Sequence, residues 1–231
     1  MIPKIIHYCW FGNELPDKFK IYLYSWIEHL WTKGYIIKYW TLDNIKEFID
    51  SSNAHYMIEH KLWAFLSDYI RCKVLYKYGG IYLDSDIILC DNFDKICNLD
   101  TYLGLERCTN IDFPKLNNHL ICFAIMGSFP RNHLFLKIID LINHLDKKYL
   151  YGSERVLAGG MFTNYILDNV KYKIVDSIEE AASCEKSGIL PLFNAPTFDS
   201  FPSKLEQHDY DICDHFYHNT WVDYEVKQKN I

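Results

Sequence analysis

The sequence lacks the cysteine and glycine patterns that define several common classes of protein. Its eight cysteines show no C-x-x-C spacing, so we expect small buried thiols in a reducing compartment instead of a zinc site or a disulfide framework. The phosphate-binding spacings G-x-G-x-x-G and G-x-x-x-x-G-K are also absent, which argues against a Rossmann oxidoreductase or a P-loop enzyme. The cysteines are Cys9, Cys72, Cys90, Cys97, Cys108, Cys122, Cys184 and Cys213.

Long apolar runs and an excess of basic residues are missing as well. The N-terminus does not follow the charged, apolar and small-residue order of a signal peptide, and polar residues interrupt the longest apolar candidate, Leu134 to Leu145. The net charge of -6 argues against a nucleic-acid partner, because phosphate backbones are held by clustered Lys and Arg. We therefore expect a cytoplasmic protein.

The chain does contain enough apolar material for a sizeable core. With 231 residues, of which 49% are hydrophobic and 23% charged, we expect one domain over residues 1–231. The aromatic content of 16% suggests that some rings line a carbohydrate or base pocket, although packing is the simpler role for any one tyrosine. We find no internal repeat and no low-complexity segment.

Two carboxylates, Asp84 and Asp86, follow a short apolar run. Hard cations such as Mg²⁺ and Mn²⁺ bind carboxylate oxygens, and Mg²⁺ usually combines one or two carboxylates with the phosphates of a substrate. In an extended conformation both side chains would point to one side, with Ser85 pointing away. The pair predicts a metal site for a phosphate-bearing ligand, and the alternative is a solvated acidic turn.

The residues before the acidic pair predict one structural unit. Lys61 to Tyr78 shows helical apolar spacing, and Gly79 is expected to end the helix. Gly79 and Gly80 then turn the chain tightly into residues 81–83, a run short enough for a buried strand. The acidic pair would lie at the end of this strand.

Strand and helix patterns alternate along the chain. This order predicts an α/β fold with a mainly parallel central sheet flanked by helices, whose ligands bind at the carboxyl ends of the strands. Thr41 or Asp43 would cap one helix and Asn132 another, while residues 109–118 would form a loop beside an acceptor cleft. The expected strands are 4–8, 35–40, 81–83, 102–105 and 121–126, and the expected helices are 16–31, 43–49, 61–78, 133–145 and one that begins near 158–162.

Two blocks of the sequence resemble one family. Phe65–Arg71 followed by Tyr78–Asp86 closely resembles the DXD-containing sugar-binding region of glycosyltransferases, and Ile2–Gly12 is similar to the first strand and turn of that family. The group includes bacterial capsular and lipopolysaccharide sugar transferases, yeast-type initiating mannosyltransferases and, more distantly, clostridial glucosylating toxins. The resemblance implies the GT-A type of nucleotide-sugar fold.

The resemblance also implies roles for four polar residues. Asp84 and Asp86 would hold Mn²⁺ or Mg²⁺, which neutralises charge on the departing nucleotide. Asp68 and Arg71 match positions that contact the donor, Arg71 by donating to phosphate or sugar oxygens and Asp68 by accepting from sugar hydroxyls. Because they are three residues apart, the alternative is a helix-surface ion pair worth ~0.3 kcal/mol.

Aromatic residues complete the implied donor site. Trp10 follows the first strand, where related enzymes contact or stack on the base, and Tyr82 precedes the acidic pair. Either ring could instead belong to the core. Trp221 would close over the donor.

A block near the C-terminus, 214–221, resembles the family's His-x-x-x-Ser-Trp pattern. His218 or Asn219 would complete the metal shell or contact the diphosphate, through a neutral imidazole or an amide oxygen. Thr220 stands where the family usually has serine, which leaves the choice between them open.

These implications together predict a metal-dependent glycosyltransferase that retains anomeric configuration and serves polysaccharide biosynthesis. It would move a hexose from a nucleoside-diphosphate sugar, with UDP-hexose favoured and GDP-mannose second, to a hydroxyl of a glycan, lipid-linked or protein acceptor. Donor positioning and metal electrostatics would supply most of the acceleration. For a lipid-linked acceptor, the protein would associate peripherally with the cytoplasmic face of a membrane.

The sequence is also compatible with two other functions. One is a non-catalytic nucleotide-sugar-binding subunit, because the chain is short and its middle matches the family only loosely. The other is a nucleotidyltransferase, which can use a similar sheet and metal pair. Such an enzyme normally has a basic triphosphate loop near its N-terminus, and residues 7–13 contain no Lys or Arg.

Overall fold

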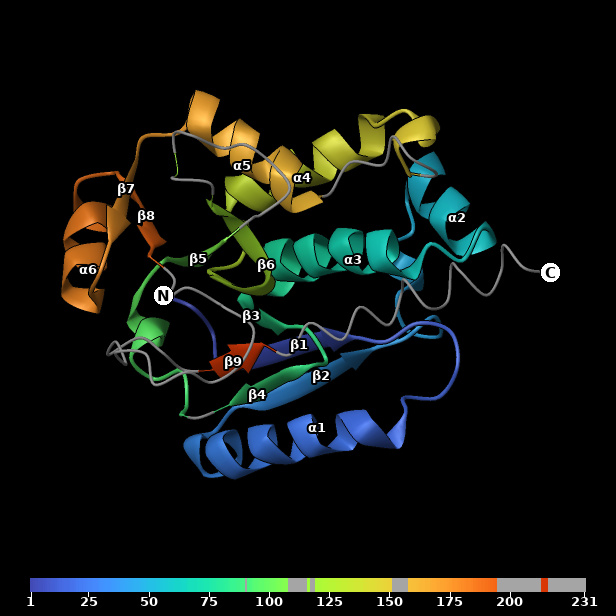
Figure 1. Cartoon of the computed structure of the whole chain (residues 1–231), viewed down its shortest axis with the longest axis horizontal. Coiled ribbons are helices and arrows are strands. Elements are labelled where there is room, and N and C mark those ends of the chain that lie inside the picture. The colour runs from blue at the N-terminus through green and yellow to red at the C-terminus, as the bar shows by residue number, and fades with distance from the viewer. Residues whose placement is uncertain (90, 108–115, 117–118, 151–157, 195–212, 216–231) are drawn as a thin grey trace.

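A seven-stranded sheet forms the centre of the protein (Figure 1). The computed structural model describes residues 1–89, 91–107, 116, 119–150, 158–194 and 213–215. The strand order is β2-β1-β3-β6-β5-β8-β7. The strands of this sheet are β1 (Ile5–Cys9), β2 (Ile36–Trp40), β3 (Gly80–Leu83), β5 (Thr101–Arg107), β6 (His119–Ser128), β7 (Tyr172–Val175) and β8 (Leu190–Phe193).

Most neighbouring strands of the sheet are parallel. β1 is parallel to β2 and β3, and β8 is parallel to β5 and β7. β6 runs antiparallel to both of its neighbours, β3 and β5. The predicted mainly parallel α/β fold is therefore confirmed. The reversal at β6 was not predicted, because a strand buried on both faces is a continuous apolar run whichever way it points.

Helices cover both faces of the sheet, over two separate hydrophobic clusters. Alternate residues of β3 enter different clusters: Ile81 and Leu83 contribute to one, and Tyr82 to the other. The Tyr82 cluster includes residues of α2 to α5, whereas the other includes residues of α1 and α6. The helices are α1 (Asp17–Leu30), α2 (Ser52–Glu59), α3 (Trp63–Tyr78), α4 (His133–His144), α5 (Ala158–Asn169) and α6 (Ile178–Lys186).

Two predicted helices need correction. The helix expected at 61–78 begins at Trp63, because Lys61 has a left-handed φ of 53° that separates α3 from the unpredicted α2. The helix expected at 43–49 is only a 3₁₀ helix, Lys46–Phe48. Here Asn44 accepts a hydrogen bond from the Thr41 backbone N–H and donates to the Tyr39 carbonyl, which stabilises a turn in place of a helix.

The predicted cap of α4 and, for the cysteines that the structure describes, the predicted burial are confirmed. The Asn132 side chain caps α4 by accepting from the Leu134 N–H at 3.0 Å. Among the residues that the structure describes, no helix combines the length and hydropathy needed to cross a bilayer. Most of the predicted 109–118 loop lies outside the described residues. The cysteines described with their side chains are buried, namely Cys9, Cys72, Cys97, Cys122 and Cys184.

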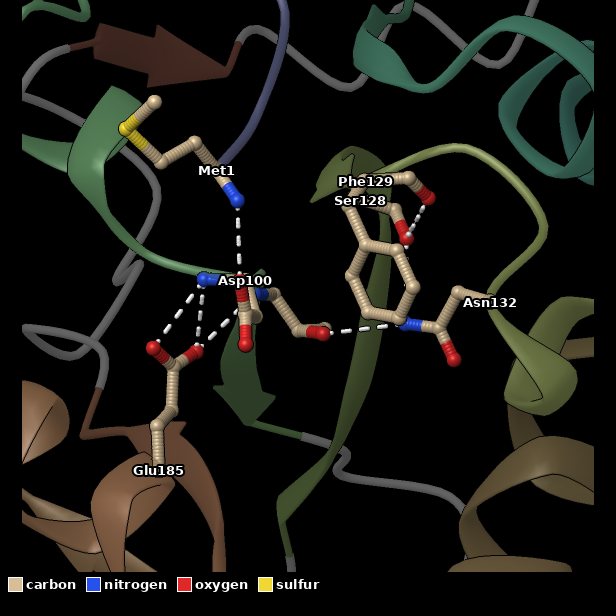
Figure 2. Close-up of polar contacts among 7 residues, drawn as sticks. Met1, Asp100, Ser128, Phe129, Asn132 and Glu185 are labelled. Carbon is tan, nitrogen blue, oxygen red and sulfur yellow. Dashed lines mark hydrogen bonds and ion pairs between the residues drawn. The ribbon is translucent and has the colours of Figure 1, made fainter.

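Polar contacts at the start of β5 join α6 to the sheet (Figure 2). The Glu185 carboxylate accepts hydrogen bonds from the backbone N–H groups of Asp100 and Thr101, the shortest at 2.9 Å. The Asn132 amide donates to the hydroxyls of Thr101 and Ser128, each at 3.0 Å. One cluster therefore connects α6, β5, β6 and the cap of α4.

Candidate functional site

The acidic pair is held by a turn that only glycine can form. Gly79 ends α3, and its N–H donates to the Leu75 carbonyl at 2.9 Å. Gly80 has a φ of 98°, and a Cβ at this position would lie 2.4 Å from the carbonyl oxygen of Ile5. The predicted glycine turn is thus confirmed, and it seats β3 directly against β1.

The pair itself lies in a tight turn and not in an extended strand, so that expectation was wrong. β3 ends at Leu83. The Asp84 N–H donates to the Ala124 carbonyl at 2.8 Å, and the Ile87 N–H donates back to the Asp84 carbonyl at 3.2 Å. This second bond closes a four-residue turn that presents both carboxylates at the end of β3, where they are half-buried.

Arg71 connects the helix α3 to this turn. Its guanidinium forms ion pairs with Asp68 at 3.0 Å and with Asp84 at 3.1 Å. It also donates to the Ser67 hydroxyl at 3.0 Å, to the Ser67 carbonyl at 3.3 Å and to the Phe123 carbonyl. Arg71 therefore ties together the α3 face, the acidic turn and strand β6.

This arrangement excludes the helix-surface ion pair that the spacing alone allowed. The side chain of Arg71 is only 5% exposed, and that of Asp68 is 19% exposed. Burial alone would lower the pKa of Arg71, but the carboxylates of Asp84 and Asp68 outweigh it and raise that pKa. The guanidinium therefore stays charged beside the acidic turn.

Tyr82 and Trp10 have different environments. Tyr82 is 1% exposed, and its ring lies 4.4 Å below the guanidinium of Arg71. Because so little of its surface is accessible, Tyr82 supports Arg71 by a cation–π contact. Trp10 is half-buried in the loop after β1, where its indole N–H donates to the Asn13 carbonyl at 2.9 Å and its ring packs on Phe19.

A second, two-stranded sheet follows the acidic turn. It pairs β4 (Ile87–Leu89) with β9 (Cys213–His215) in antiparallel register, with Ile87 opposite His215. The C-terminal block therefore begins beside the residue that follows Asp86. The predicted residues His218, Asn219 and Trp221 lie outside the described residues.

Side chains of α1 hold β4 on the side away from β9. The Trp26 indole N–H donates to the Ile87 carbonyl at 2.8 Å, and the Leu89 N–H donates to the Ser25 hydroxyl at 3.0 Å. We did not predict these residues. The only sequence signal was a tryptophan on the apolar face of the helix, which gives no hint of its acceptor.

The donor chemistry of the acidic turn fits a hard divalent cation. Within the described part of the chain, no group of three His, Cys, Asp or Glu side chains lies close enough to hold a metal alone. Two carboxylates completed by phosphate oxygens are, however, an ordinary Mg²⁺ site. Asp84 and Asp86 therefore fit such an ion when a diphosphate is present.

Comparison with known proteins finds a similar sequence region and a similar fold. Residues 16–103 match the family described as "Glycosyltransferase sugar-binding region containing DXD motif". Over 72% of its length the chain superimposes on 69% of the PaToxG glycosyltransferase, with a TM-score of 0.51 and 19% sequence identity. The fold is thus the GT-A type seen in glycosyltransferases.

Proteins that are similar in sequence have names that refer to glycosyl or mannosyl groups. Inositol phosphoceramide mannosyltransferase 3 of Schizosaccharomyces pombe is 36% identical over 138 residues, which is 58% of this chain and 35% of the relative. The uncharacterized glycosyltransferase L373 of Acanthamoeba polyphaga mimivirus is 27% identical over 58% of this chain and 53% of its own length. Mannosyl phosphorylinositol ceramide synthase CSH1 of Saccharomyces cerevisiae is 27% identical over 64% of this chain and 37% of the relative.

The chain therefore has the fold found in nucleotide-sugar glycosyltransferases, with an acidic turn at the end of β3. Its residues 16–103 are similar to the sugar-binding region of the DXD-containing glycosyltransferases. The chain spans only 35% to 53% of the lengths of the relatives named above.

Proposed function

We propose that the protein is a metal-dependent glycosyltransferase that moves a hexose from a nucleoside-diphosphate sugar to an acceptor hydroxyl, with retention of anomeric configuration. One observation carries the proposal. The acidic turn lies at the end of β3 and is joined by Arg71 to Asp68, within the region that matches the family.

Within this proposal Asp84 and Asp86 hold Mn²⁺ or Mg²⁺, which supplies Lewis-acid stabilisation of the leaving diphosphate. Asp68 accepts hydrogen bonds from sugar hydroxyls. Arg71 orients both Asp68 and Asp84 through its two ion pairs and adds positive charge close to the diphosphate.

The remaining predicted residues complete the donor site. Trp10 lies in the loop after β1, at the carboxyl end of a parallel strand, and would contact the base. Tyr82 acts on the donor through Arg71. His218 or Asn219 would join the metal shell, and Trp221 would cover the donor. The pairing of β9 with β4 supports this role, because it starts the C-terminal block beside the acidic turn.

The names of the relatives refine the substrates. Two of the three are named as an inositol phosphoceramide mannosyltransferase and a mannosyl phosphorylinositol ceramide synthase, which favours a mannose donor and a lipid acceptor with a sugar-like headgroup. A mannose nucleotide is therefore tested beside the UDP-hexose that we first expected. We also propose that residues 1–231 act as one domain, in the cytoplasm or at the cytoplasmic face of a membrane.

Thermal unfolding tests the donor site directly. The chain is heated with UDP, GDP or CMP, and with their sugars, in Mn²⁺ and in EDTA. A ligand that binds the folded state adds about 2.7 kcal/mol to the free energy of unfolding at a hundred times its dissociation constant. We expect stabilisation by one nucleotide, and we expect EDTA to abolish it.

Single substitutions then test the catalytic roles. Asp86→Asn and Asp84→Asn are expected to abolish sugar transfer at saturating Mn²⁺, whereas Asp140→Asn, at a half-exposed carboxylate on α4, serves as the matched control. Full transfer by either acidic-turn variant would refute the mechanism. Nucleotide binding without transfer to any acceptor tested would instead support the non-catalytic subunit.

A further inference from the structure

The outer face of α1 carries an unusual group of exposed apolar side chains. Ile21 is 61% exposed, Tyr24 67%, Ile27 46% and Trp31, directly after the helix, 76%. Single exposed apolar residues are normal on a protein surface, but these four follow one another at spacings of three or four and so share one stripe. We call this stripe the α1 outer face. The opposite side of the helix is buried through Phe19, Tyr22, Trp26 and Leu30.

Nothing in the described chain covers this face. In Figure 1, α1 forms an outermost layer, with the labelled elements on one side of it only. A tryptophan and a tyrosine in the same exposed stripe are the residue types that dominate the energetics of protein interfaces. The α1 outer face is therefore a candidate docking surface.

The charges on this face are self-complementary. Lys20 and Glu28 both lie on the exposed side of α1, four residues before and four residues after Tyr24. If a second α1 lay antiparallel across the first, with the two Tyr24 side chains at the two-fold axis, each Lys20 would face the partner helix's acidic position 28. By the same symmetry Ile21 would face the partner's position 27, which is also isoleucine.

We infer that a second copy of this chain docks on the α1 outer face, with the two α1 helices antiparallel about Tyr24. The two-fold arrangement produces two Lys–Glu pairs and two Ile–Ile contacts from one helix sequence. The inference goes beyond the proposed function and does not depend on it.

A membrane surface fits the same face less well. Interfacial helices that bind anionic lipids carry Lys or Arg along their polar side. Here Asp17 and Glu28 balance Lys18 and Lys20 on the exposed part of the helix. The net charge of the whole chain is -6. The charge pattern thus favours a partner with both signs of charge.

Sedimentation equilibrium over a range of protein concentrations tests the inference. We expect a monomer–dimer equilibrium. Lys20→Glu or Glu28→Lys alone turns both symmetric attractions into repulsions and should raise the dimer dissociation constant about tenfold. The double variant, Lys20→Glu with Glu28→Lys, exchanges the two charges and should restore dimerisation to within about twofold of the unchanged chain.

The apolar contribution has its own variants. Tyr24→Glu should leave only monomer at concentrations where the unchanged chain dimerises, because it places two carboxylates at the two-fold axis. Leu141→Glu, at an exposed leucine on α4 that is 38% exposed, is the matched control and should leave the equilibrium unchanged. Circular dichroism melting of each variant checks that the fold is intact, which is expected since all these side chains are exposed.

Three results would overturn the inference. One is an unchanged chain that stays monomeric at every concentration, and another is a double variant that is as dissociated as the single ones. The third is a monomer that binds phosphatidylcholine vesicles through Tyr24 and Trp31, which would identify the face as a lipid-binding surface.

Discussion

Replacing Arg71 by methionine should destabilise the fold more than any surface substitution. The guanidinium is 5% exposed and pairs with Asp68 and Asp84 at 3.0 and 3.1 Å. Removing one partner of a buried ion pair costs about 3–5 kcal/mol, because the remaining charge stays buried without compensation. Asp84 is 29% exposed and keeps some hydration, so we expect a loss near the lower end, about 3 kcal/mol.

Urea unfolding measures this loss, and two further variants locate its cause. Arg71→Lys keeps the charge but loses the planar fork, so it should cost about 1–2 kcal/mol through the unmade hydrogen bonds to Ser67 and Phe123. Asp84→Asn in the Arg71→Met background should recover about 1 kcal/mol, because it removes an uncompensated carboxylate.

Arg131→Met is the control, because the Arg131 side chain is exposed. It should change the free energy of unfolding by less than about 0.5 kcal/mol. If Arg71→Met also stayed within that range, the ion pairs would be worth no more than surface pairs, and Arg71 would not be the residue that holds the acidic turn against α3.

Two further predictions concern stability. Burial lowers the pKa of His7 from 6.5 to about 4, although the hydrogen bond to the Gly79 carbonyl acts in the opposite direction. Between these two pH values the imidazole is protonated in the unfolded chain and neutral in the folded chain. His7 therefore contributes stability that is complete above pH 6.5 and is lost as the pH falls towards 4, with about 2 kcal/mol lost by pH 5. Urea unfolding of the unchanged chain and of His7→Gln should differ in this pH dependence, and an imidazole that titrates near 6.5 by NMR would contradict the assignment. Gly80→Ala should prevent stable folding, since its Cβ would lie 2.4 Å from the Ile5 carbonyl oxygen. Gly34→Ala, at a φ of 78° with open space around it, should cost only about 1 kcal/mol when both glycine variants are measured by urea unfolding.

Local signals predicted the elements around the acidic turn well. The end of α3 at Gly79, the buried strand β3 and the shared face of Asp68 and Arg71 each depend on residues a few positions apart. Glycine conformation and helical spacing determine such features, and both can be read from a single segment.

Contacts between distant segments could not be predicted in the same way. The Phe123 carbonyl accepts from Arg71 and the Ile87 carbonyl accepts from Trp26. Because every residue has a backbone carbonyl, the residue type does not indicate which carbonyl accepts such a bond. The antiparallel direction of β6 and the pairing of β4 with β9 depend on which strands pair with each other. The apolar pattern of a strand does not identify its partner. The sequence therefore allowed candidate residues to be named, whereas the contacts that connect Asp68, Arg71 and Asp84 to the rest of the fold could not be predicted.

The pairing of β4 with β9 also has a consequence for the order of folding. The glycine turn, β3 and α3 are neighbours along the chain, so they can associate early at a small cost in loop-closure entropy. β9 lies far along the chain from β4, so it can join β4 only after all the residues between them have left the ribosome. A nascent chain would thus carry a preformed acidic turn before the segment that adjoins it is available.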